Sequence, residues 1–175
     1  MLNGALVGLR AVESTDLPKL LAWRNRPEFR RFFRENRELS TTQQESWFNT
    51  VVMHDSSVRM FSIVELTTGR LLGACGLCSI NWTDRNADLS IYIGADDLYI
   101  DNTFAPDAAR TLIKYGFEEL GLHRIWAEIY SIDEPKQKLF ATLGLALDGR
   151  HRETHWAEGR WVDSLFYGIL NQVPK

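Results

Sequence analysis

The chain has 175 residues, a net charge of −3 and a hydrophobic fraction of 45%. This length suits one domain with its own core, and the composition excludes an intrinsically disordered chain. The acidic balance argues against a protein that follows nucleic-acid phosphates along its surface. Because no apolar run approaches about 20 residues and no secretory signal is visible, we expect a cytoplasmic protein without a membrane or nucleic-acid partner.

The N-terminal third is predicted to hold one strand followed by helices. Residues 6–12 alternate as a strand does, and the polar run 14–16 offers an N-cap to the helix that follows. A second helical segment begins near Pro27, and Ser40 opens a third, capped helix with apolar residues at 47–52. Six arginines lie between residues 24 and 37, where they form either a local anion-binding patch or a solvated helix face.

Strands dominate the rest of the chain. The predicted strands lie at 58–66, 70–80, 87–93, 123–130, 145–157 and 161–170. An acidic loop at 94–102 precedes a long helix over 104–120, and a short helix over 134–143 ends at Gly144. This order predicts an α+β fold in a single domain over 1–175, with a mixed, mostly antiparallel, twisted sheet of about seven strands and about four flanking helices.

The two cysteines form a C-x-x-C pair inside a predicted strand. Positions three apart on a strand face opposite sides, so Cys75 and Cys78 cannot share a metal ion. We therefore expect buried thiols in a reducing compartment. The four histidines lack ligand spacing, and no metal site is predicted.

Several local motifs resemble one enzyme family, in the same order along the chain. They are WRN at 23–25, ADLSIYIG at 87–94, YGFEELGLHRI at 115–125, LFATLGL at 139–145 and GRWVDSLFYGIL at 159–170. With the element order, they resemble the GNAT superfamily of N-acetyltransferases, in its ribosomal-protein-alanine and nucleotide-amino-sugar branch. The resemblance implies a GNAT fold, acetyl-CoA as co-substrate, and direct acetyl transfer in a ternary complex to a primary amine on a protein N-terminus or an amino sugar.

The resemblance also implies where the chemistry lies. Backbone groups of Ile91, Tyr92 and Ile93 would bind the pantetheine arm and polarise the thioester carbonyl. Glu128 stands where many members carry the general base, and Asp88 is a second carboxylate on the preceding strand. Either carboxylate could take the amine proton directly or through a water. The alternatives are a plain sheet strand and a structural ion pair.

The pyrophosphate loop of the family is degenerate in this sequence. Its basic residue and glycines are absent from residues 100–105, where Asp101 adds a negative charge. The implied cofactor contacts at this end are Asn102, Thr103, Phe104 and Ala105. The helix N-terminus itself still favours an anion.

Three positions on the short helix also depart from the family. Asp133 replaces an asparagine, Lys136 replaces a serine, and Phe140 replaces the tyrosine that protonates the leaving thiolate. We assign all three to the cofactor site by position. Lys136 is either a phosphate partner or a solvated helix lysine, and Tyr130, Tyr92 or a water would have to supply the proton.

The acceptor site is expected between the N-terminal helices and the final hairpin. Its candidate residues are Trp23, Arg24, Asn25 and Trp47, with the alternative that both tryptophans belong to the core. The final hairpin offers an edge strand, so the protein is expected to be a monomer or a homodimer. Two further hypotheses are a catalytically impaired GNAT-fold binding protein and an acyltransferase with an atypical donor.

Overall fold

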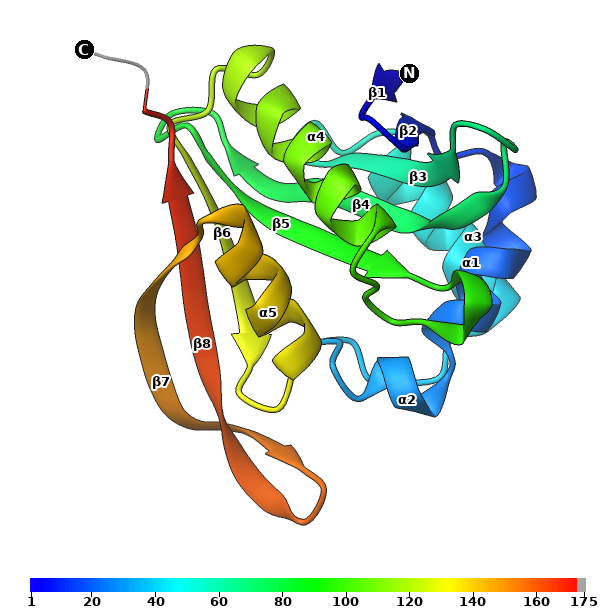
Figure 1. The fold of residues 1–175 in the computed structure, drawn as a ribbon. Helices are drawn as coiled ribbons and strands as arrows, with labels where there is room; N and C mark the ends of the chain where they lie inside the picture. The colour runs from blue at the N-terminus through cyan, green and yellow to red at the C-terminus, as the bar shows by residue number, and fades with distance from the viewer. Residues whose placement is uncertain (173–175) are drawn as a thin grey trace.

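A single eight-stranded sheet runs through the molecule, with helices on both of its faces (Figure 1). The computed structural model describes residues 1–172. The strand order is β1-β2-β3-β4-β5-β6-β8-β7, and all neighbours are antiparallel except β5 and β6. The strands are β1 (Leu2–Asn3), β2 (Val7–Ala11), β3 (Arg59–Glu65), β4 (Leu71–Asn81), β5 (Asn86–Ile93), β6 (Arg124–Tyr130), β7 (Ala146–Ala157) and β8 (Arg160–Leu170).

Two helices cover one face of the sheet, and the N-terminal helices lie on the other (Figure 1). The helices are α1 (Leu17–Arg24), α2 (Pro27–Arg30), α3 (Thr41–Trp47), α4 (Phe104–Glu118) and α5 (Glu134–Leu143). A π-helical turn, Phe48–Val52, extends α3, and short 3-10 turns lie at Ser14–Asp16 and Ala95–Asp97. In residues 1–172, no helix has the length and apolar character that a membrane span requires.

The α+β fold predicted from the sequence is confirmed, with eight strands and five helices where about seven and about four were expected. The additional strand is β1, whose two residues are too few to carry a usable hydrophobic period. The helical segment expected near Pro27 is present as α2, a single turn. The predicted cap of the third helix is confirmed, because Ser40 Oγ accepts a hydrogen bond from the Gln43 amide at 3.2 Å.

The N-cap predicted at 14–16 is wrong in its detail. These residues form a 3-10 turn, and α1 begins at Leu17 without a side-chain cap. The Asp16 carboxylate instead turns back, where it accepts hydrogen bonds from the Arg10 guanidinium at 2.7 Å and from the Ser62 hydroxyl at 2.7 Å. Asp16 thus ties the turn to β2 and β3 and does not cap the helix.

The two cysteines lie on opposite faces of β4, as the strand period predicts. Cys75 is fully buried in the core, whereas Cys78 is partly exposed, with its Sγ 3.8 Å from the Sδ of Met60. The expectation of two buried thiols is therefore correct only for Cys75. Burial raises the pKa of the Cys78 thiol to about 11, so Cys78 is a protonated thiol at neutral pH.

Gly94 follows β5 directly and lies against the indole of Trp23. A Cβ at this position would overlap the ring, so we expect Gly94→Ala to lower the free energy of unfolding by about 1–3 kcal/mol. The matched control is Gly149→Ala, because no atom lies within 4 Å of a Cβ there. Urea unfolding of both variants checks the prediction, and equal effects would contradict it.

Candidate active site

The neighbouring strands β5 and β6 separate part of the way along their length. They pair only through three residue pairs, the last being Asp88 with Trp126. Beyond that point β6 stays with β8 as far as the pair Tyr130–Ser164, while β5 stays with β4. The parallel pair therefore opens into a splay in the middle of the sheet, and Figure 1 shows the two strands diverging.

One edge of β5 loses its sheet partner at the splay. The Gly94 amide donates to Leu72 O on β4, whereas the Ile93 amide donates to Tyr99 O on the opposite side. Successive backbone amides of a strand point to opposite edges. The N–H of Ile91 therefore faces the splay, and that of Tyr92 faces β4. Of the three backbone positions predicted for the thioester end, Ile91 is the one whose amide faces the splay without the turn contact that engages Ile93.

Glu128 and Asp88 converge on one arginine at the narrow end of the splay. The Arg34 guanidinium donates a hydrogen bond to Asp88 Oδ2, and its Nη1 lies 3.9 Å from Glu128 Oε2. The two carboxylates differ in access, because the Asp88 side chain is 3% exposed and that of Glu128 is 24% exposed. Glu128 is consequently the solvent-accessible carboxylate of the pair.

Asp88 is an unusual buried carboxylate. Its Oδ1 is the one buried side-chain oxygen or nitrogen in the described part of the chain without a hydrogen-bond partner. Burial raises the pKa of Asp88 above its usual value, although Arg34 opposes the shift. A carboxylate whose pKa is raised toward neutral accepts and releases protons more readily at working pH.

The pH dependence of stability tests the environment of Asp88. Because its folded pKa lies above the unfolded value of about 3.9, its stability contribution is fully present below that pH and is lost as pH rises through the folded pKa. Asp88→Asn mimics the neutral acid and lacks this loss. We expect the variant to gain stability relative to wild type between about pH 4 and pH 7. Thermal unfolding at both pH values checks this, and a gap that narrows with rising pH would mean that the Arg34 ion pair outweighs burial.

A buried polar network borders the splay below the carboxylates. Asp133 caps α5 by accepting from the Lys136 amide at 3.1 Å, and it accepts a second hydrogen bond from the Tyr99 hydroxyl at 2.9 Å. Lys136 is only 8% exposed, with its ammonium 5.4 Å from the centre of the Tyr99 ring, and burial lowers its pKa. The interpretation of Lys136 as a solvated helix lysine is therefore wrong. Tyr99 was not predicted as a site residue, because it lies in an irregular loop where no hydrophobic period indicates burial.

Aromatic side chains from α2 and the turn after it pack into the same region. Phe32 stacks on Tyr99 with ring centres 4.7 Å apart, and Phe33 meets Tyr92 edge-on at 5.6 Å. A cavity of about 230 Å³ remains, bordered by β5, β6, α5 and this segment. Its lining includes Arg24, Phe32, Arg34, Ser90, Glu128, Tyr130 and Lys136. The splay is thus an aromatic-walled cavity that Glu128 lines, while Asp88 lies outside its lining.

The N-terminus of α4 already holds an anion from the chain itself. The Asp101 carboxylate accepts hydrogen bonds from the amides of Thr103 at 3.0 Å, Phe104 at 2.7 Å and Ala105 at 2.7 Å. These are three of the four positions predicted to contact the pyrophosphate, and the fourth, Asn102, lies exposed beside them. A phosphate would therefore have to displace Asp101, so the pyrophosphate end does not fit this arrangement.

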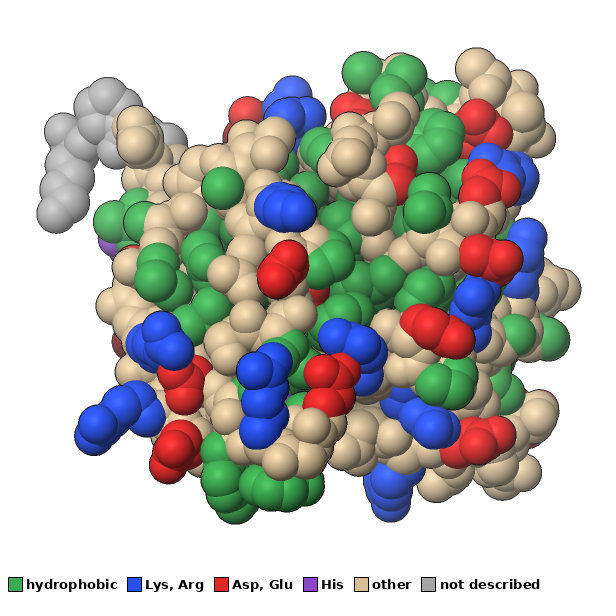
Figure 2. Space-filling model, turned by 60° about the horizontal axis from the view of Figure 1, so that its bottom comes forward, with side chains coloured by type: hydrophobic (Ala, Val, Ile, Leu, Met, Phe, Trp, Pro, Cys, Tyr) green, Lys and Arg blue, Asp and Glu red, His purple; other side chains and the backbone are tan. Residues whose placement is uncertain are grey.

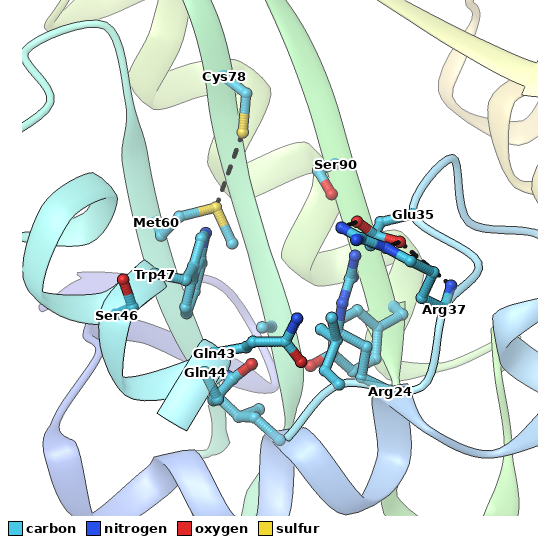
Figure 3. Close-up of a pocket in the computed structure, with 14 residues that line it drawn as sticks. Arg24, Glu35, Arg37, Gln43, Gln44, Ser46, Trp47, Met60, Cys78 and Ser90 are labelled. Carbon is cyan, nitrogen blue, oxygen red and sulfur yellow. Dashed lines mark hydrogen bonds and ion pairs between the residues drawn. The ribbon is translucent and has the colours of Figure 1, made fainter. Parts of the chain in front are cut away.

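A larger cavity of about 510 Å³ adjoins the splay on the face that carries α1 and α3 (Figure 3). Arg24 enters it from α1 and Trp47 from α3, so two of the four residues expected at the acceptor site line this cavity. Its polar lining also includes Glu35, Arg37, Gln43, Gln44, Ser46 and Ser90. Because Arg24, Glu35 and Ser90 line both cavities, a molecule in the larger cavity would approach the splay along these side chains.

Two predicted acceptor residues have structural roles instead. Trp23 is 8% exposed and packs against Gly94 in the core. The Asn25 side chain donates to Leu39 O at 2.8 Å and accepts from the Leu39 amide at 2.9 Å, which fixes the loop that follows α2. Neither residue lines the larger cavity, and Trp23 takes the core position that was the alternative to its acceptor role.

The structure distinguishes the two tyrosines that could supply a proton to the leaving thiolate. Phe140 is fully buried beside Tyr167 and does not line the cavity at the splay. Tyr92 faces the other cavity, and burial raises its pKa well above the usual range. Tyr130 lines the splay and stacks on His155 at 3.9 Å. Of the two alternative tyrosines, Tyr130 is therefore the one placed to act there.

The charged face at the open end of this region mixes both signs (Figure 2). Acidic and basic side chains alternate around an apolar centre, so that most charges have a partner of opposite sign nearby. In the described chain, no group of three or more His, Cys, Asp or Glu side chains is arranged to hold a metal ion.

The fold and the splay together define an acetyltransferase of the GNAT type. Residues 7–146 match the family model of the acetyltransferase (GNAT) domain, and the chain belongs to that family. The predictions of a GNAT-type N-acetyltransferase and of acetyl-CoA as its co-substrate are thereby confirmed.

The relatives extend over nearly the whole chain. An N-acetyltransferase of Bacillus licheniformis, p20, is 25% identical over 94% of this chain and 92% of its own length. The spermidine N(1)-acetyltransferase of Vibrio cholerae is 28% identical over 89% of this chain and 87% of its own. The structure of the V. cholerae spermidine N-acetyltransferase in complex with CoA and spermine covers 95% of this chain and 96% of its own, at 25% identity and a TM-score of 0.85.

Proposed function

We propose that this enzyme acetylates a primary amine at the β5–β6 splay, with Glu128 as the proton acceptor. The proposal is supported chiefly by one observation, that Glu128 is the accessible member of a carboxylate pair held by Arg34. A protonated amine is not a nucleophile, so a base must remove a proton before the nitrogen attacks. Glu128 lines the cavity and takes that proton, while Asp88 behind it holds Arg34 in position.

The remaining roles follow from the walls of the splay. The bound donor supplies an acetyl thioester, whose acetyl group passes to the amine nitrogen while the sulfur leaves as the CoA thiol. The Ile91 amide faces the gap, where a backbone donor can stabilise negative charge on a carbonyl oxygen. Tyr130 supplies a hydroxyl proton on the β6 side of the same cavity. The aromatic segment around Phe32 and Phe33 excludes water from the splay.

The site offers different contacts to the two ends of acetyl-CoA, the thioester and the pyrophosphate. The thioester end suits the splay, whereas the α4 amides are already engaged by Asp101. We infer that the pyrophosphate contributes less to donor affinity here than a glycine-rich loop would allow. An atypical donor without a pyrophosphate is the second candidate, and this same contact favours it.

The acceptor we propose is a protein N-terminus or an amino sugar, as in the ribosomal-protein and amino-sugar branch. A putative ribosomal N-acetyltransferase of Bacillus subtilis, 23% identical over 81% of this chain, is among the relatives, together with several spermidine N(1)-acetyltransferases. The spermidine acetyltransferases among the relatives act on a polyamine, which is a polycation. The larger cavity has one carboxylate, Glu35, and its pKa falls to about 2 through hydrogen bonds from Arg37. This charge balance does not suit a polycation.

The test is a CoA-release assay with purified protein, acetyl-CoA and a panel of amines. Primary amines are expected to release thiol, and their N-trimethylated counterparts are expected to release none, because they have no proton to lose. A panel in which no primary amine supports thiol release would overturn the proposed function. Release with both types of amine would indicate thioester hydrolysis.

We further propose that the protein works as a monomer or a homodimer in the cytoplasm. The edge strand β7 supports a dimer, because Trp156 and Trp161 at the hairpin end are each 56% exposed. The two free thiols suit a reducing compartment. A related V. cholerae enzyme forms a dodecamer, so light scattering of the purified protein is the direct test of assembly.

A further inference from the structure

Six arginines crowd the segment from 24 to 37, and five of them are ion-paired. Their partners are Glu28 and Asp97 for Arg26, Glu38 for Arg30, Glu158 for Arg31, Asp88 and Glu128 for Arg34, and Glu35 for Arg37. Arg24 has no carboxylate within ion-pair distance in the described part of the chain. Its guanidinium instead lies 4.7 Å from the centre of the Phe33 ring. The segment is thus neither a uniform anion patch nor a solvated helix face, but a set of paired arginines with one exception.

The exception points into the proposed acceptor cavity. Figure 3 shows the Arg24 side chain rising from α1 toward the Glu35–Arg37 pair, on the side of the cavity opposite Trp47. Glu35 cannot neutralise it fully, because both Glu35 oxygens are engaged by Arg37, at 2.9 and 2.6 Å. With no other acidic side chain in the lining, the cavity carries one cation in excess.

Arg24 also sits at the junction between the two cavities. It lines both the larger cavity and the splay that contains Glu128. A molecule that spans this junction can place a cationic amine toward the carboxylate end and an anionic group on Arg24. A guanidinium binds carboxylate and phosphate groups through paired N–H donors, so it suits either anion.

We propose that Arg24 is the anion-binding residue of the acceptor site, and that the acceptor is a small amine with a carboxylate or phosphate group. The inference rests on the proposed function and narrows its acceptor. A cavity of about 510 Å³ accommodates a molecule of amino-acid or sugar-phosphate size. A polyamine would bring a second ammonium toward Arg24, where two like charges repel.

Three acceptors that differ only at one end test the proposal. 4-Aminobutyrate, n-butylamine and 1,4-diaminobutane share a four-carbon chain and end in a carboxylate, a methyl group and an ammonium. O-Phosphoethanolamine against ethanolamine provides the phosphate arm. We expect kcat/KM to be at least about tenfold higher for the anionic member of each set, since a hydrogen-bonded charge pair contributes on the order of tenfold or more to binding.

Substitutions of Arg24 test whether the preference for anionic acceptors depends on this side chain. Arg24→Gln is expected to lower kcat/KM about ten- to hundredfold for the anionic acceptors, mainly through KM, and to lower it much less for n-butylamine. Arg24→Lys keeps the charge without the planar fork and should lose less. The control Arg110→Gln removes an exposed arginine of α4 that has no ion pair within residues 1–172 and lies far from Arg24 in the sequence, and it should change nothing.

A binding measurement separates this inference from the proposed function. Isothermal titration of 4-aminobutyrate and O-phosphoethanolamine without donor should show binding to the wild type that Arg24→Gln weakens. If amines are acetylated without preference for an anion, or if the preference survives in Arg24→Gln, the inference is overturned while the proposed function stands. If Arg24→Gln weakens acetyl-CoA binding and leaves acceptor binding intact, Arg24 belongs to the donor site and the inference fails.

Discussion

Replacing Glu128 by glutamine should lower kcat/KM for acetyl transfer by about 10²- to 10⁴-fold, the range that a positioned general base contributes. Glutamine has nearly the same shape and cannot accept the amine proton. The loss should appear in kcat as well as in kcat/KM, because the amine still binds but is not deprotonated. Steady-state kinetics with a saturating donor measure both parameters.

The matched control for this variant is Glu118→Gln on α4. Glu118 also lies 3.9 Å from a basic group, the ammonium of Lys114, but on the exposed surface. Its loss should leave kcat/KM within about twofold, as an exposed ion pair contributes little. If Glu128→Gln retained full activity while Asp88→Asn lost it, the buried carboxylate would be the base and the roles given to the pair would be reversed.

Replacing Asp101 by glycine should change donor affinity and stability in opposite directions. It removes the carboxylate from the amides of Thr103, Phe104 and Ala105, so that a pyrophosphate can take its place. We expect the Kd for acetyl-CoA to fall about tenfold. The free energy of unfolding should fall by about 1 kcal/mol, because the first turn of α4 loses its capping side chain.

The control Asp97→Gly distinguishes the hydrogen bonds of Asp101 to the α4 amides from the negative charge of the loop. It removes one carboxylate from the same acidic loop, where Asp97 pairs with Arg26 and makes no hydrogen bond to α4. Titration calorimetry with acetyl-CoA should show tighter binding for Asp101→Gly only. Equal gains in both variants would mean that loop charge alone weakens the donor, and no gain in either would mean that the α4 amides do not bind the pyrophosphate.

The fold was largely predictable because its long elements carry strong periodic signals. The strands β3 to β5 are runs of strand-forming residues separated by turn residues, and α5 ends at Gly144, a C-cap in the left-handed conformation. The residues that the family pattern places on these strands, Glu128 and Asp88, do meet in space because the two strands are neighbours. For residues on paired strands, the position in the sequence is enough to predict which side chains lie close together.

The residues that sequence analysis misplaced depend on side-chain direction or on loops. Trp23 and Arg24 are adjacent on α1, yet one faces the core and the other the cavity, and a short helix gives too few turns to tell them apart. Arg34 and Tyr99 lie in irregular segments, where no period indicates burial. Lys136 looked solvated because a lysine is almost never buried without opposite charge nearby. Of the two carboxylates that act on it, Asp88 is distant in the sequence, and Asp133, three residues away, gave no sequence signal of its own burial.

The most direct test follows an isotope-labelled acetyl group from acetyl-CoA to a primary amine by mass spectrometry, in wild type and in Glu128→Gln. Label on the amine nitrogen with wild type, together with its near absence with Glu128→Gln, is the result expected if the splay is the active site. Equal labelling by both proteins would place the chemistry elsewhere. No labelling of any amine by the wild type would contradict acetyl transfer at this site.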